Sequence, residues 1–149
     1  MQATPDLSAP RTIICFDFGL RRIGVAVGQD VSGSASPLGV VANRDDGVDH
    51  DRIAAILREW KPTQLVVGMP AHADGSPSEM QEPVDAFIQE LRRYGLPVAT
   101  VDERYTSIEA ERVLKKARAA GTRGRISKDI VDAAAAVLIA ERYLAIQDS

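Results

Sequence analysis

The sequence has little of what cross-links a small protein or anchors it in a membrane. A single cysteine, Cys15, excludes an internal disulfide and a zinc site built from cysteines, and its apolar surroundings predict a buried core residue. No apolar run approaches the ~18 residues of a membrane span, and residues 1–10 lack the features of a signal peptide. With 149 residues, 45% of them hydrophobic and 26% charged, the chain suits one globular domain. We therefore expect a soluble cytoplasmic protein.

The charge is unevenly distributed, although the formal net charge is only −3. Six basic residues and no acidic one lie between positions 115 and 128, whereas the other 135 residues carry 12 basic and 21 acidic side chains. Such a basic segment predicts an anion-binding surface, with a solvated loop as the alternative. Aromatic residues make up 5% of the chain and few accompany this segment, so base stacking is not expected there.

The apolar pattern predicts alternating strands and helices after an initial meander. Strands are expected at residues 12–18, 23–28, 38–42, 65–68 and 98–101. Helices are expected at residues 53–60, 80–91, 106–117 and 127–146. The pattern predicts an α/β fold with a five-stranded mixed sheet, three antiparallel strands and then two parallel ones, covered by helices on both faces. The domain would span residues 12–147, after a loose N-terminal leader of residues 1–11.

Carboxylates lie where this arrangement would place them near one another. Asp17 lies near the end of the first strand, Asp102 and Glu103 end the last, and Asp132 opens an alanine run in the final helix. Ligand sites in open α/β sheets lie beyond the carboxyl ends of the strands. Because side chains alternate along a strand, we expect only one of Asp102 and Glu103 to face the site. The alternatives are a turn-capping role for Asp17 and solvated surface charges for the others.

Together these carboxylates fit a two-metal nuclease. Such enzymes hold a pair of hard divalent cations ~3.5–4 Å apart with converging oxygen ligands. The neighbouring basic segment would hold the phosphate backbone, so the residues point to metal-assisted phosphodiester hydrolysis.

Four segments resemble the YqgF/RuvX family of pre-16S rRNA nucleases and Holliday junction resolvase-like proteins. They are residues 17–26 (DFGLRRIGVA), 66–70 (VVGMP), 102–107 (DERYTS) and 132–136 (DAAAA), in the family's order over residues 12–146. Met69, Tyr105 and Ser107 replace common family residues, and none of these departures removes a carboxylate.

The resemblance implies an RNase H-like fold and a cytoplasmic, metal-dependent nuclease that matures the 5′ end of pre-16S rRNA. It implies a triad of Asp17, Glu103 and Asp132 binding Mg²⁺ or Mn²⁺, with two ions expected and Asp102 as a fourth candidate. Basic residues beside the carboxylates or in the basic segment would bind phosphate: Arg21, Arg22, Arg104, Arg123, Arg125 and Lys128. For Arg21 and Arg22 the alternative is an exposed polar turn.

Other functions remain open at this point. The chain could resolve branched DNA as a Holliday junction resolvase, or bind nucleic acid without cutting it, which the retained carboxylates disfavour. Some ATP-binding proteins begin with a similar hairpin. A chain of 149 residues is too short, however, for a second lobe that closes over a nucleotide. We expect nucleic acid as the partner, no membrane association, and a monomer or weak homodimer.

Overall fold

A computed structural model describes residues 11–69, 81–102 and 128–147. Its elements follow the chain in this order: β1 (Thr12–Asp17), β2 (Arg22–Gln29), β3 (Ser34–Arg44), β4 (Gly47–Val48), α1 (His50–Trp60), β5 (Gln64–Met69), α2 (Gln81–Leu91), the 3₁₀ turn η1 (Arg92–Tyr94), β6 (Val98–Asp102) and α4 (Lys128–Gln147). The helix expected at residues 106–117 lies outside the described residues. None of the described helices is long and apolar enough to span a membrane.

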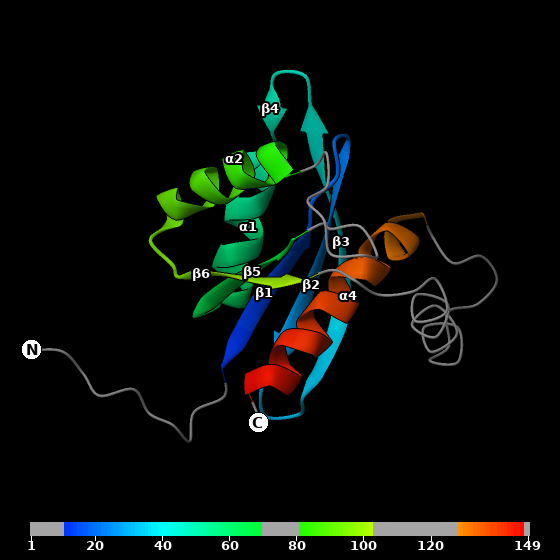
Figure 1. The fold of residues 1–149 in the computed structure, drawn as a ribbon, viewed down its shortest axis with the longest axis vertical. Helices are drawn as coiled ribbons and strands as arrows, with labels where there is room; N and C mark the ends of the chain where they lie inside the picture. The colour runs from blue at the N-terminus through cyan, green and yellow to red at the C-terminus, as the bar shows by residue number, and fades with distance from the viewer. Residues whose placement is uncertain (1–10, 70–80, 103–127, 148–149) are drawn as a thin grey trace, which may run out of the picture.

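The strands form one mixed sheet with the order β4-β3-β2-β1-β5-β6 (Figure 1). β1 pairs antiparallel with β2 on one side and parallel with β5 on the other, which makes β1 a central strand. β5 in turn pairs parallel with β6. The predicted α/β class and the switch from antiparallel to parallel pairing are therefore confirmed.

The predicted strand count of five is wrong, because the described part of the chain contains six strands. The additional strand, β4, has two residues and pairs with the end of β3, where Asn43 faces Val48 and Arg44 faces Gly47. A pair this short shows no alternation in the sequence, and the acidic residues around it are typical of the entry to a helix. Gly47, with a φ of +124°, permits the tight return of the chain.

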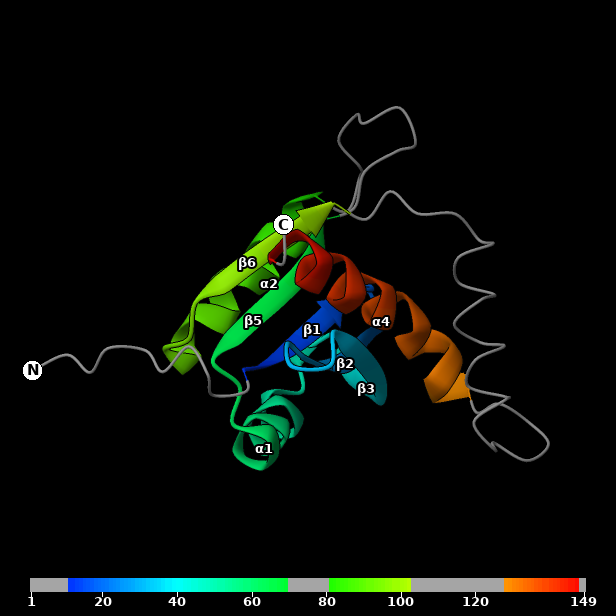
Figure 2. The ribbon, with the colours of Figure 1, turned by 90° about the horizontal axis from the view of Figure 1, so that it is seen from below.

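Alternate residues of β1 pack on opposite faces of the sheet, as the two-residue period of a strand requires. Ile14 and Phe16 belong to a core formed with α1 and α2, whereas Ile13 and Cys15 belong to a second core formed with α4. Figure 2 shows α4 lying across one face, with α1 and α2 on the other. The expected helices on both faces are thus confirmed.

The alanine run in α4 lets this helix lie close to the sheet. Ala134 and Ala136 are buried against Ala26 of β2, so small side chains meet small side chains at this contact. Towards its C-terminal end, α4 packs Leu144 into the core with Ile13 at the start of β1. The helix therefore runs from the carboxyl end of β1 back towards its beginning.

Candidate active site

The carboxyl ends of β1, β5 and β6 meet at one edge of the sheet. In the parallel register Phe16 lies beside Val67, and Met69 lies beside Asp102, so Asp17 and Asp102 each end their strand at nearly the same level. Neighbouring strands are ~4.8 Å apart, which separates the Asp17 and Asp102 backbones by roughly 10 Å. Two of the predicted site residues are therefore brought to one edge by the sheet itself.

Asp17 is half-buried and lies on the face of the sheet that α4 covers. The alternation of β1, which directs Ile13 and Cys15 towards α4, assigns Asp17 to the same face. Across the hairpin it lies opposite Gly24, which has no side chain to fill the space beside the carboxylate. A carboxylate that is half-buried rather than fully desolvated stays accessible to a cation.

The turn that follows Asp17 is tight and braced from β3. Asn43 donates a hydrogen bond from Nδ2 to the Gly19 carbonyl oxygen (2.9 Å), and its backbone N–H donates to the Arg21 carbonyl oxygen (2.9 Å). Phe18 packs its ring against Phe87 of α2, with ring centroids 5.2 Å apart. The sequence prediction missed Asn43 and Phe18 as positioning residues, because neither belongs to a motif of chemically reactive residues.

The arginines of this turn are exposed. Arg21 and Arg22 both present their side chains to solvent, and Arg22 begins β2. Their position beside Asp17 agrees with the expected phosphate-binding role and also with the alternative of a polar turn.

The remaining predicted residues are only partly described, or not at all. Glu103, Arg104, Arg123 and Arg125 lie outside the described residues. For the others the structure gives the backbone alone: Asp102 ends β6, Lys128 begins α4, and Asp132 is the fifth residue of α4. Asp132 precedes the buried Ala136 by four residues, about one helical turn. Among the described residues, no three His, Cys, Asp or Glu side chains form a group that could hold a metal ion.

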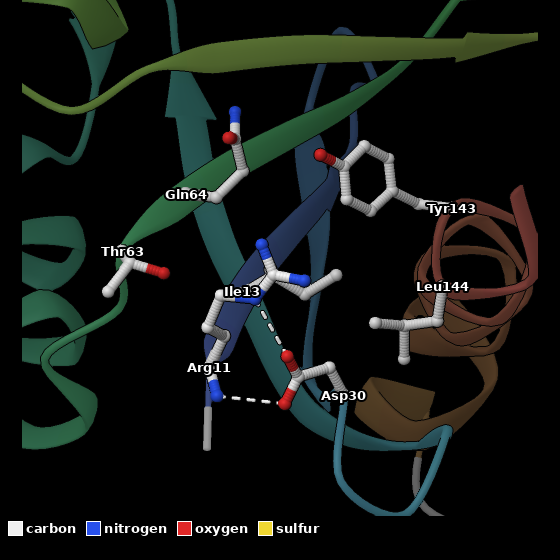
Figure 3. Close-up of a pocket in the computed structure, with 7 residues that line it drawn as sticks. All are labelled: Arg11, Ile13, Asp30, Thr63, Gln64, Tyr143 and Leu144. Carbon is white, nitrogen blue, oxygen red and sulfur yellow. Dashed lines mark hydrogen bonds and ion pairs between the residues drawn. The ribbon is translucent and has the colours of Figure 1, made fainter. Parts of the chain in front are cut away.

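A separate cavity of about 280 Å³ lies at the opposite end of β1 (Figure 3). Its lining comes from the starts of β1 and β5, the end of β2 and the C-terminal part of α4: Arg11, Ile13, Asp30, Thr63, Gln64, Tyr143 and Leu144. The backbone N–H and Nε of Arg11 donate to the two carboxylate oxygens of Asp30, at 2.8 and 2.7 Å. These hydrogen bonds hold the pKa of Asp30 below its ordinary value. Because this carboxylate is engaged by Arg11 and far from Asp17, we assign it a structural role at the start of β1.

Comparison with known proteins assigns the family. The RuvX family model, described as Holliday junction resolvase, matches residues 11–146. A relative from Azotobacter vinelandii named "Putative pre-16S rRNA nuclease" is 43% identical over 140 residues, 93% of this chain and 96% of its own. One with the same name from Paraburkholderia xenovorans is 43% identical over 134 residues, 89% and 87% of the two chains.

Solved structures support the fold. Thermus thermophilus RuvC in complex with Holliday junction substrate has a TM-score of 0.56 at 14% identity, covering 93% of this chain and 96% of its own. Fowlpox virus resolvase with substrate Holliday junction DNA has a TM-score of 0.60 at 10% identity, covering 93% and 99%. The expected RNase H-like fold is thereby confirmed. The chain belongs to the RuvX family, a family of nucleases that hydrolyse phosphodiester bonds.

Proposed function

We propose that this nuclease is a cytoplasmic enzyme that processes the 5′ end of pre-16S rRNA with the help of divalent cations. The observation that carries the proposal is Asp17, a half-buried carboxylate at the end of a central strand, at the edge where β5 and β6 also end. The names of the relatives support rRNA as the substrate. Branched DNA is the second candidate, because the family description and the structural neighbours refer to Holliday junctions.

The residues at this edge fit Mg²⁺ or Mn²⁺. Carboxylate oxygens are the ligands that hard divalent cations prefer, and half-burial lets Asp17 contribute one without full desolvation. We propose Asp17, Glu103 and Asp132 as ligands of two ions, with Asp102 as the alternative to Glu103. In β6, Ala99 and Val101 pack on the face covered by α4, which is the face of Asp17. The two-residue period of a strand therefore favours position 103 over position 102 as the ligand.

Divalent cations held there would supply an activated water and stabilise the leaving oxygen. The chain's own residues would orient the substrate: the guanidinium groups of Arg21 and Arg22, one turn beyond Asp17, are suited to bind phosphate oxygens. The braced turn fixes the backbone that carries these arginines relative to the end of β1. Phosphate binding further along the nucleic acid would come from Arg104, Arg123, Arg125 and Lys128. The affinity for nucleic acid should then fall as the salt concentration rises.

Cleavage of labelled precursor RNA and of a four-way DNA junction tests the proposal. Both substrates are incubated with Mg²⁺ or Mn²⁺ and, separately, with a chelator. We expect 5′-end cleavage of the RNA, its loss with the chelator, and its loss in Asp17→Asn. Preferential cleavage of the junction would replace rRNA processing by junction resolution.

A matched control separates site chemistry from surface charge. Glu59 is an exposed glutamate at the C-terminal end of α1, just before β5 begins, so Glu59→Gln removes the same charge at the opposite end of the sheet. We expect this variant to cut like the wild type. If the wild type binds RNA in a salt-dependent way but cuts neither substrate, the chain binds nucleic acid without cutting it.

A further inference from the structure

Leu20 is an exposed hydrophobic side chain at the edge of the sheet where Asp17 lies. Among the described residues, Leu20 and Val31 are the large hydrophobic side chains that stand exposed, at 62% and 71%. Each occupies a hairpin turn, but the turns lie at opposite ends of the sheet. Val31 follows β2 at the end where β1 begins, whereas Leu20 follows β1 three residues after Asp17. A single exposed leucine needs no explanation by itself, so it is the setting of Leu20 that gives it significance.

The setting of Leu20 is rigid. A Cβ atom added at Gly19 would lie 2.4 Å from the Arg22 carbonyl oxygen, which shows how closely the chain folds back on itself. Asn43 holds the carbonyl oxygens on both sides of Leu20, those of Gly19 and Arg21. The leucine therefore projects from a turn whose backbone is fixed before any ligand binds.

The chemistry around Leu20 matches a bound nucleic acid. Arg21, exposed and next in sequence, can pair with a phosphate, while an aliphatic side chain can enter the space between two bases. We propose that Leu20 inserts into a base step of the bound nucleic acid and unstacks it beside the phosphodiester that Asp17 serves. This inference rests on the proposed function, and it identifies Leu20 as a positioning residue that selects structured substrates.

The geometry limits where the unstacked step can lie. Three residues of extended chain span at most ~11 Å, so the Cα atom of Leu20 lies within this distance of the Cα atom of Asp17. Successive nucleotides of one strand rise ~3.4 Å in a stacked helix. The unstacked step should therefore lie within about three nucleotides of the cut.

The test uses 2-aminopurine, whose fluorescence rises when it unstacks, placed in an RNA with a duplex and a single-stranded 5′ extension. A series of such RNAs carries the label at each of the three nucleotides on either side of the cut. Where the wild type makes no cut, the label is moved along the boundary between duplex and single strand. Binding is measured in an Asp17→Asn background, in which the RNA stays intact. The variants added are Leu20→Ser, Leu20→Met and, as the matched control, Val31→Ser.

We expect the fluorescence to rise when the parent protein binds, and most of this rise to be absent with Leu20→Ser. The affinity for the RNA should fall about five- to twentyfold in this variant, because the apolar burial of one leucine is lost. Leu20→Met and Val31→Ser should behave like the parent protein. A full rise in Leu20→Ser, or no rise at any position with RNA bound, overturns the inference even if the wild type cuts. A Leu20-dependent rise with a wild type that never cuts retains the inference and rejects the proposed activity. Absence of RNA binding rejects both.

Discussion

Replacing Gly19 by alanine perturbs the turn that follows Asp17 in a way the structure makes specific. The added Cβ would lie 2.4 Å from the carbonyl oxygen of Arg22, whereas Cβ atoms essentially never approach another atom closer than 3.0 Å. The obstructing atom belongs to the backbone, so no rotation of a side chain relieves the clash. Either the turn opens or the first residue of β2 moves.

Both movements act against existing contacts. Opening the turn stretches the hydrogen bond from Asn43 Nδ2 to the Gly19 carbonyl oxygen, which is 2.9 Å long. Overpacking of this kind costs about 1–3 kcal/mol of unfolding free energy. Each kcal/mol corresponds to roughly 2–4 °C in Tm for a domain of this size. Displacing Asp17 and the neighbouring arginines by a fraction of an ångström to ~1 Å should also lower kcat roughly tenfold to hundredfold.

Thermal unfolding and cleavage kinetics measured on the same preparations test this reasoning. Gly33→Ala is the matched control: Gly33 has a φ of +63° and open space around its Cβ position, so alanine there costs only backbone strain of about 1–2 kcal/mol. It should lower Tm and leave kcat unchanged, because its turn lies at the other end of the sheet. If Gly19→Ala has the same Tm and kcat as the wild type, the coupling between the turn and the site is refuted. Equal losses of kcat in both variants would attribute the effect to general destabilisation.

Three further changes test the packing and charges of the domain. Phe87→Ala should lower the unfolding free energy by about 3–5 kcal/mol in urea, because this buried ring packs edge-on against Phe16 at 5.5 Å; a loss below 1 kcal/mol would contradict it. Asp30→Asn should lower Tm at pH 7, since Arg11 depresses the pKa of Asp30 in the folded state. The Tm difference between the wild type and Asp30→Asn should have its full size above the ordinary Asp pKa, and it should vanish as pH falls through the depressed pKa. A Tm difference that does not depend on pH would argue against the ion pair. Burial raises the pKa of the Cys15 thiol, so a thiol reagent should modify it only as fast as the protein unfolds; immediate reaction would disprove its burial.

The strongest sequence patterns predicted the fold best. The first strand was expected at residues 12–18 and is found at Thr12–Asp17, and its apolar residues separate cleanly into two cores. β3 was expected only at residues 38–42 but spans Ser34–Arg44, because its first half consists of small and polar residues. β4 was missed since two residues of backbone pairing leave no pattern of side chains. Local pattern thus locates buried strands and fails where backbone hydrogen bonds alone define one.

The sequence indicated Asp17 as a candidate site residue but not the contacts that support the turn beside it. Asp17 stood out because a carboxylate at the end of an apolar strand needs a partner. Asn43 did not, since its role depends on the pairing of β3 with β2, which brings residues about twenty positions apart together. The arginines beside Asp17 were noted for their charge, whereas the fixed turn that presents them became visible only in three dimensions.

The central position of β1 explains why a carboxylate at residue 17 suits chemistry that requires fixed ligands. β1 is hydrogen-bonded on both sides, and Ile14, Cys15 and Phe16 before Asp17 are fully buried between α4 and the helices of the opposite face. Moving Asp17 along the strand would require the register with both neighbours to change at once, and a slip of one residue would exchange the two cores. The same hydrophobic burial that stabilises the domain therefore preorganises the carboxylate, while the turn beyond it remains exposed to solvent.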